Sequence, residues 1–168
     1  LALVVDTNPT MNQGYKEISK LDSAIEVCTI IGEEMIRRGY KLVIATGADD
    51  GEMRSFTSKE RREMFEHLAL ISAKRMSDPG QTLARVIREY PRMRRALVFT
   101  DLENARTLVP VIRRNRRKNI IVVVPQLPKL TIPEGNYSRA SRQYLEELIG
   151  MLYVYEMSLR SLRLSQIK

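Results

Sequence analysis

The sequence predicts an α/β domain built on a doubly wound, mostly parallel sheet with helices on both faces. Four short apolar runs indicate strands, at residues 2–5, 42–45, 96–100 and 120–124. Segments with helical periodicity and capping residues separate these runs. Strands that lack polar alternation are typical of parallel sheets covered by helices on each face.

Length and composition are those of one globular domain. The chain has 168 residues, of which 43% are apolar and 29% are charged, so it can bury a core without disulfides. We expect an α/β domain over residues 1–125, followed at 126–168 by a loop and a helix packed on the same domain. The single cysteine, Cys28, cannot form an internal disulfide. This favours a reducing compartment, and we expect a cytoplasmic domain.

No apolar run approaches the roughly 20 residues that a membrane helix needs, and we expect no signal peptide. The chain begins inside an apolar run, as a domain excised from a longer protein does. A membrane anchor in a parent protein therefore stays open.

The first half of the chain has clear element boundaries. Asp6 ends the first strand, and a loop rich in Asn, Pro, Thr and Gly follows. The Ser-Lys-Leu-Asp segment at 19–22 is a capping box that begins a helix, and Gly39 ends this helix. After the second strand, a turn at 48–51 leads to a short segment at 53–56. This pattern predicts an antiparallel hairpin at the edge of the sheet.

Capping residues and prolines also bound the later elements. The Thr-Ser-Lys-Glu segment at 57–60 caps a helix that we expect to run to about Arg75. A further helix ends at Pro91. Pro110 requires the next helix to begin near Thr107, because proline is tolerated only in the first turn of a helix.

Beyond Pro125, an irregular stretch leads to a predicted long C-terminal helix. Its apolar residues recur at alternating steps of three and four and form a narrow seam: Leu145, Leu148, Leu152, Tyr155, Leu159 and Leu162. We expect this seam to pack on the flank of the same domain. A coiled coil with another chain is the weaker alternative, because three heptads make a short run.

The net charge of +8 is concentrated in the later part of the chain. Residues 1–53 carry 5 Lys and Arg against 9 Asp and Glu, whereas residues 54–168 carry 23 against 11. The densest basic runs, 92–95 and 113–118, contain no aromatic side chains that could stack on bases. The second run also closes a helix, where cations are favourable, so nucleic acid is not the expected partner. Nonspecific nucleic-acid binding through this run stays an alternative.

The scarcity of soft and nucleophilic residues narrows the chemistry. His67 is the only histidine and is expected beside the apolar stripe of its helix, whereas Cys28 is expected to be a small buried core residue. Neither residue suits a zinc site or a nucleophile–base pair. The sequence also lacks both glycine-rich loops that cradle phosphates.

Two carboxylates end core strands, Asp6 after the first and Asp101 after the third. If these strands are neighbours, the two strand ends lie about 5 Å apart, where like charges repel unless a cation lies between them. Asn8 and Thr10 add oxygen atoms on the same loop as Asp6. Hard oxygen ligands favour Mg²⁺ or Mn²⁺ over zinc.

The loop Asp6-Thr7-Asn8-Pro9-Thr10 resembles the Asp-x-Ser-x-Ser loop of von Willebrand factor A-type (vWA) domains. In those domains, a metal-ion-dependent adhesion site joins this loop to a Thr from a second loop and an Asp from a third. The corresponding positions in this sequence are Thr82 and Asp101. The resemblance covers residues 1 to about 125. It is closest to uncharacterised prokaryotic vWA-like proteins associated with MoxR-type AAA+ ATPases, through the Lys20-Leu21-Asp22, Gly80-x-Thr82 and Thr100-Asp101-Leu102 segments.

The resemblance implies a Rossmann-like fold and a metal held by Asp6, Asn8, Thr10, Thr82 and Asp101. The metal is expected to be Mg²⁺, or else Mn²⁺ or Ca²⁺, with one coordination position left for a carboxylate of a partner protein. Asn8 stands where the family has Ser. Its amide oxygen reaches one atom further and lacks a hydroxyl donor, a change that distorts, weakens or abolishes the site. The implied function is protein interaction, with a MoxR-type ATPase as the partner suggested by the family.

Asn8, Thr10 and Thr82 also have purely structural interpretations. Asn8 and Thr10 can cap their own turn through local hydrogen bonds to the backbone. Thr82 can be the N-cap of the helix that follows. For Asn8 and Thr10 this capping is the alternative to metal binding, whereas the N-cap role of Thr82 is compatible with it.

The same loop is also similar to the Asp-x-Asp-x-Thr motif of haloacid-dehalogenase-type phosphatases. In this alternative, Asp6 is the nucleophile and Thr46 binds phosphate. However, Asn8 cannot act as an acid or base, no clear Lys motif follows, and Ala105 stands where that family has a second acid. We therefore expect an interaction module rather than an enzyme.

Overall fold

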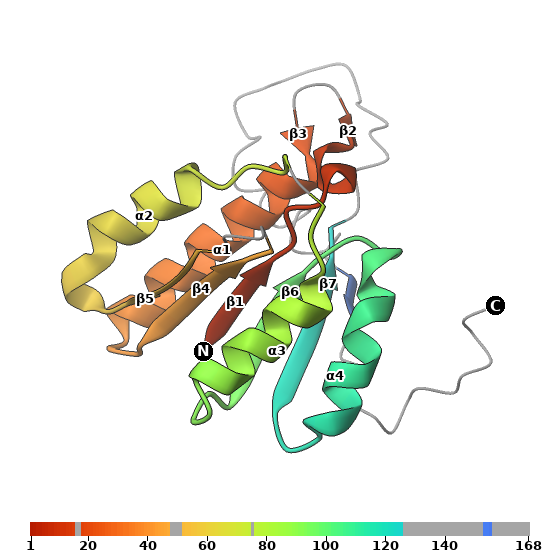
Figure 1. Ribbon diagram of the computed structural model, residues 1–168. Helices are drawn as coiled ribbons and strands as arrows, with labels where there is room; N and C mark the ends of the chain where they lie inside the picture. The colour runs from red at the N-terminus through yellow and green to blue at the C-terminus, as the bar shows by residue number, and fades with distance from the viewer. Residues whose placement is uncertain (16–17, 48–51, 75, 126–152, 156–168) are drawn as a thin grey trace.

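A six-stranded sheet forms the centre of the structure, a computed structural model that describes residues 1–15, 18–47, 52–74, 76–125 and 153–155 (Figure 1). The strand order is β5-β4-β1-β6-β7-β8. The inner strands β4, β1, β6 and β7 are parallel, and the strands at the two edges are antiparallel to their neighbours. The strand bounds are β1 Ala2–Val5, β4 Leu42–Thr46, β5 Met53–Phe56, β6 Arg95–Phe99, β7 Asn119–Val124 and β8 Tyr153–Tyr155. The predicted fold class and the predicted antiparallel edge strand are confirmed.

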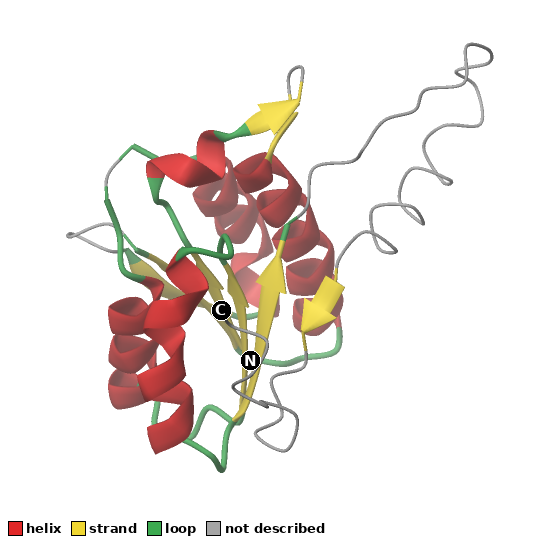
Figure 2. Ribbon diagram, turned by 90° about the vertical axis from the view of Figure 1, so that its right-hand side faces the viewer, coloured by secondary structure: helices red, strands yellow, loops and turns green. Residues whose placement is uncertain are grey.

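Helices cover both faces of the sheet, as the view in Figure 2 shows. On one face, Leu3 and Val5 of β1 pack with residues of α1, Lys20–Arg37, and of α2, Arg61–Ala69. On the other face, Ala2 and Val4 pack with α3, Pro79–Glu89, and α4, Leu108–Arg114. Because both sets of β1 side chains are buried, the strand is apolar without alternation.

Local sequence signals determine most helix ends. The predicted capping box is present at α1, where Ser19 and Asp22 exchange hydrogen bonds, and Gly39 follows the helix with φ of 79°. Thr107 precedes α4, so Pro110 lies in its first turn as predicted. Short 3₁₀ segments complete the domain: η1 Pro9–Asn12, η2 Ser58–Glu60 and η3 Asn104–Thr107. Beyond η1, β2 Gly14–Tyr15 and β3 Ile18–Ser19 form a small antiparallel pair.

Three predicted boundaries differ from the structure. The helix α3 begins at Pro79 with Asp78 as its N-cap, so Thr82 lies inside the first turn and is not the cap. Asp78 is the N-cap because its carboxylate accepts hydrogen bonds from the backbone N–H groups of Gly80 and Gln81. The helix α2 ends at Ala69 and does not reach residue 75, because the following segment turns into the core. There, the carbonyl of Ala73 accepts a hydrogen bond from the Asn12 amide at 2.6 Å.

The third difference concerns the C-terminal helix. Tyr153–Tyr155 form β8 and pair with Val122–Val124 of β7, so the predicted helix does not pass through them. Aromatic and β-branched residues favour a strand, and the edge of β7 offers unpaired backbone groups to bind it. The other residues of the predicted seam lie outside the described residues. Among those described, no helix has the length and apolar content needed to cross a bilayer.

His67 and Cys28 are both core residues. Cys28 is fully buried, as predicted, and burial raises the pKa of its thiol, so it is not a reactive nucleophile. His67 is 4% exposed and is buried with Met64 and Leu68 of the apolar stripe of α2. Its ring lies 5.5 Å from that of Phe56, and its Nδ1 lies 3.3 Å from a Glu52 carboxylate oxygen. Burial lowers the pKa of His67, with Glu52 opposing the shift and Arg54 adding to it.

We expect His67 to make the domain less stable as the pH falls below about 6.5, the ordinary pKa of histidine. Because the folded-state pKa is below the unfolded value, the unfolded chain binds the proton first. The loss is at most about 1.4 kcal/mol per pH unit for one proton. Melting temperatures of the wild type and of His67→Gln between pH 7.5 and 5 test this, with a flatter profile expected for the variant. If the melting temperatures of both proteins change equally with pH, the His67 ring takes up no proton on unfolding.

Candidate functional site

The candidate site lies at the carboxyl ends of β1 and β6, which are neighbours in the sheet. The register pairs Val5 with Phe99, and the Asp6 N–H donates to the Phe99 carbonyl at 2.9 Å. Asp6 and the Thr100-Asp101 pair therefore leave the sheet at the same level. From β1 the chain continues to β4 on one side of β1, whereas the later strands β6 and β7 lie on the other side. The strand order therefore reverses between β1 and β6, and ligands of α/β folds usually bind at such a point.

Asp6 is the centre of the polar cluster and is completely buried. One carboxylate oxygen accepts from the Asn8 N–H at 2.9 Å and from the Ser77 hydroxyl at 2.6 Å. The other accepts from the Thr100 hydroxyl at 2.6 Å and from the Asn104 amide at 3.1 Å. Four donors from three separate segments thus hold one carboxylate in a fixed orientation.

Asp101, which is 4% exposed, joins the same cluster. One of its oxygens accepts from the Thr10 hydroxyl and, at 3.2 Å, from the Asn104 amide. The other accepts from the backbone N–H of Asn104 at 2.8 Å. The Asn104 amide nitrogen therefore donates to both carboxylates, and it also lies 3.5 Å from the Thr10 hydroxyl.

Asn8 contributes chiefly by shaping the loop. Its side-chain oxygen caps η1, lying 3.5 Å from the Thr10 backbone nitrogen and 3.4 Å from the Thr10 hydroxyl. Its amide donates to the Ser77 carbonyl at 3.4 Å, which ties the first loop to the second. The predicted turn-capping role is therefore present in the structure, and the amide oxygen stays beside the cluster.

Thr82 is the one predicted site residue that the structure does not bring into the cluster. Its hydroxyl donates to the Asp78 carbonyl at 3.1 Å, one turn back in α3. Ser77 occupies the place expected for it, since the Ser77 hydroxyl contacts Asp6 and also accepts from the Thr7 N–H at 3.2 Å. The difference follows from the earlier start of α3, which puts residue 82 inside a helical turn and residue 77 at the rim of the sheet.

No protein-family model and no curated protein matches the chain. Its fold matches solved structures, among them the conserved hypothetical protein BatB from Bacteroides thetaiotaomicron, at TM-score 0.55 and 19% identity. That match covers 73% of this chain and 63% of BatB. An aerotolerance-related membrane protein from Bacteroides fragilis matches at TM-score 0.51 and 16% identity, over 95% of this chain and 82% of that one. A von Willebrand factor type A protein from Catenulispora acidiphila matches at TM-score 0.50 and 13% identity, over 71% of this chain and 31% of that one.

The chain has a von Willebrand factor A-type fold. In this vWA-type fold, the three loops that meet at the candidate site follow β1, precede α3 and follow β6. Sequence reasoning missed Ser77, Thr100 and Asn104, whose side chains complete the cluster. Thr100 directly precedes a predicted site carboxylate, and Asn104 follows it by three residues, which is the spacing of a local capping bond. Ser77 carried no signal beyond being a short hydroxyl residue in a loop.

The donor set of this vWA-type site suits a hard divalent cation. Two carboxylates are buried together, and no cationic side chain among the described residues pairs with either of them. Among the described residues, the hydrogen-bond donors to these carboxylates are hydroxyl groups, the Asn104 side-chain amide and backbone N–H groups, none of which carries a full charge. Every side-chain acceptor in the cluster is oxygen. The described residues hold no group of three or more His, Cys, Asp or Glu, so an ion here would be held by two carboxylates together with neutral hydroxyl and amide oxygens. Oxygen-only sites favour Mg²⁺, Mn²⁺ or Ca²⁺ over zinc.

Proposed function

We propose that this vWA-like domain is a protein-interaction module that binds a carboxylate of its partner through a divalent metal. One observation carries the proposal: Asp6 and Asp101, almost 100 residues apart in sequence, share the Asn104 amide as a donor in a buried all-oxygen cluster. Two such carboxylates repel each other, and a divalent cation relieves that repulsion better than neutral donors do.

The residues that would hold such an ion are Asp6, Asn8, Thr10, Ser77 and Asp101. The hydroxyls of Thr10 and Ser77 belong to half-buried side chains, so they form the accessible side of the cluster, whereas both carboxylates lie beneath them. When bound, Mg²⁺ supplies the positive charge that a partner's Asp or Glu side chain would seek. The described members of the cluster include no histidine or thiol that could act as a general base or nucleophile.

The rim of the site supports a protein partner. Met76, which precedes Ser77, is 74% exposed, and Leu102, which follows Asp101, is 71% exposed. Apolar side chains beside a polar anchor are typical of protein interfaces, where they exclude water from the central contact. By resemblance to the prokaryotic vWA-like proteins, a MoxR-type AAA+ ATPase is the partner that we propose.

The phosphatase alternative is less well supported by the geometry. A phosphoryl acceptor needs a carboxylate oxygen that a whole phosphomonoester, much larger than a metal ion, can reach, yet Asp6 is 0% exposed and each of its oxygens accepts two hydrogen bonds. Thr46, its proposed phosphate ligand, lines a neighbouring hollow with Gly47, Thr82 and Arg85, and Asp6 is not part of that lining.

We expect millimolar Mg²⁺ or Mn²⁺ to raise the melting temperature of the domain. An ion at about 100 times its Kd stabilises the folded state by about 2.7 kcal/mol, which corresponds to roughly 5–10 °C for a domain of this size. In Asp101→Asn the rise should be lost, while the matched control Asp22→Asn, an exposed capping carboxylate on α1, should keep it. Differential scanning fluorimetry measures the melting temperature of each protein after chelation, with and without the added ion. A wild-type melting temperature that does not respond to either ion would refute the metal site.

The partner half of the proposal has its own experiment. The immobilised domain should retain a MoxR-type ATPase in Mg²⁺ and release it into a chelator, and Asp101→Asn should not retain it. Retention that survives both the chelator and the substitution would show that the contact does not use this site.

A further inference from the structure

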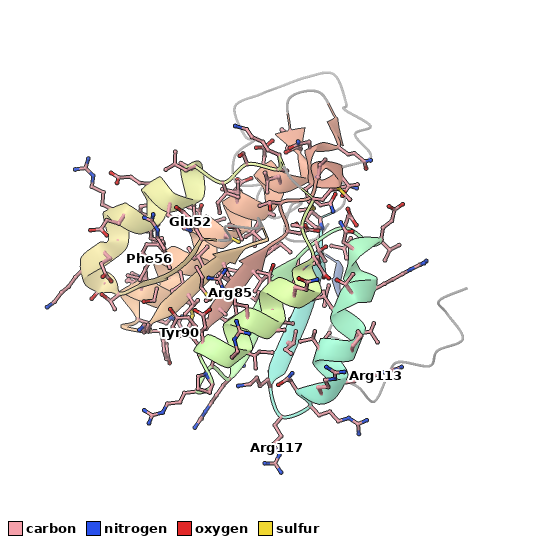
Figure 3. The ribbon with its side chains drawn as sticks, viewed as in Figure 1. Glu52, Phe56, Arg85, Tyr90, Arg113 and Arg117 are labelled. Carbon is pink, nitrogen blue, oxygen red and sulfur yellow. The ribbon has the colours of Figure 1, made fainter. Side chains whose placement is uncertain are left out.

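A second charged surface lies at the opposite end of the sheet. Its segments, residues 91–94 and 113–118, flank the amino ends of β6 and β7, whereas the candidate site lies at the carboxyl ends. Together they line one hollow of about 720 Å³. We call its cations the basic pole: Arg92, Arg94, Arg113, Arg114, Arg116, Arg117 and Lys118. The two arginine runs that the sequence keeps apart are thus one surface, and Figure 3 shows Arg113 and Arg117 at this end of the molecule.

The six arginines of the basic pole are exposed and have no acidic partner among the described residues. Elsewhere on the domain, arginines do find partners: Arg37 and Arg38 pair with Glu34, and Arg62 pairs with Glu66. In the part of the chain that the structure describes, no acidic side chain lines the hollow. Clustered cations repel one another, so this surface is better satisfied by an external anion than by solvent alone.

The backbone beneath the pole is held in place. The Lys118 ammonium donates to the carbonyls of Pro91 and Met93, both at 2.8 Å, and so fastens the second segment to the first. The Asn119 N–H donates to the Arg94 carbonyl at 2.9 Å. The six guanidinium groups therefore project from a fixed base, which reduces the ordering cost of binding.

The composition of the pole distinguishes between kinds of polyanion. Among the described residues, no aromatic side chain lines the hollow, so bases have nothing there to stack on. Of the described lining residues, the apolar ones are Pro91 and the buried Met93, so these residues supply none of the apolar or aromatic anchors of a protein interface. The pole is made of two turns and the last residues of α4, a helix of 7 residues. It therefore presents no long helix or β-ribbon that could lie in a DNA groove. An anionic bilayer requires none of these features, because it binds clustered arginines through charge alone.

We propose that the basic pole docks on the anionic phosphate headgroups of a lipid bilayer. Guanidinium groups bind phosphate oxygens in pairs, and the hollow between the two segments gives a headgroup several of them at once. In this orientation the candidate metal site, at the opposite end of the strands, faces away from the membrane.

Vesicle sedimentation in the presence of a chelator tests this inference independently of the metal site. The wild type should bind phosphatidylcholine vesicles that contain phosphatidylserine, should not bind pure phosphatidylcholine, and should be released by salt. Each basic residue near an anionic surface strengthens binding roughly fivefold, so R94Q/R113Q/R117Q should bind about a hundredfold more weakly. The matched control R37Q/R61Q/R62Q removes the same charge from α1 and α2 and should bind much like the wild type.

Three outcomes would overturn the proposal: no binding to the anionic vesicles at low salt, equal binding by the pole variant and the wild type, or displacement from vesicles by duplex DNA at equal phosphate concentration. The last outcome would assign the pole to nucleic acid. If the pole variant melts early, the salt-dependent release of the wild type decides between charge-driven binding and none.

Discussion

Replacing Asp6 with alanine should destabilise the domain by about 2–4 kcal/mol in the absence of metal, because its donors lose their acceptor in a buried position. Asp6 accepts from Asn8, Ser77, Thr100 and Asn104, and the Thr100 hydroxyl is itself fully buried. The melting temperature should fall by roughly 10 °C. Urea unfolding in chelator measures the free energy directly.

Asp22→Ala is the control for Asp6→Ala. Asp22 also accepts from a hydroxyl and a backbone N–H, those of Ser19, but it is exposed at the start of α1. Loss of such a cap costs about 1 kcal/mol. If the two substitutions cost the same, the Asp6 carboxylate is not the centre of the cluster that its contacts indicate.

Gly80→Ala should destabilise the domain by about 1–3 kcal/mol, although alanine is the better helix former. A Cβ at residue 80 would lie 2.3 Å from the Thr107 carbonyl oxygen and 2.8 Å from the carbonyl carbon. These are backbone atoms at the end of η3, so α3 and η3 must move apart. Urea unfolding measures the loss of stability.

The other described helical glycine provides the comparison for Gly80→Ala. At Gly32 in α1, an added Cβ meets the Met64 sulfur at 2.9 Å and a Leu42 methyl at 3.2 Å. Both atoms are ends of flexible side chains, so Gly32→Ala should cost less than Gly80→Ala. A smaller loss at residue 80 than at residue 32 would mean that η3 yields freely. Because Asn104 belongs to η3 and Ser77 lies just before α3, Gly80→Ala should also weaken the response of the melting temperature to Mg²⁺.

The candidate site could be predicted from the sequence to the extent that strand ends determine it. The apolar runs fix β1 and β6, and Asp6 and Asp101 follow them directly, so their meeting follows once the two strands are adjacent. The typical strand order of doubly wound sheets predicts that β1 and β6 are neighbours, and their parallel pairing confirms it. Metal binding itself stays a prediction.

What the sequence could not determine depends on contacts between segments far apart in the chain. The choice of Ser77 over Thr82 follows from where α3 begins, and Asp78, Pro79 and the close approach of Gly80 to Thr107 together determine that start. In the same way, β8 forms because β7 offers an open edge, a partner that no local propensity can report.

Alone, the amino-acid sequence determined the alternation of buried strands and helices, the two carboxylates at the strand ends and the excess of arginine, because these depend on local periodicity and composition. Only the tertiary structure decided that Ser77 and Asn104 complete the polar cluster and that the two arginine runs form one surface. The physical reason is that hydrogen bonds and charge density depend on distances in space, which the chain sets only when the sheet has brought its loops together.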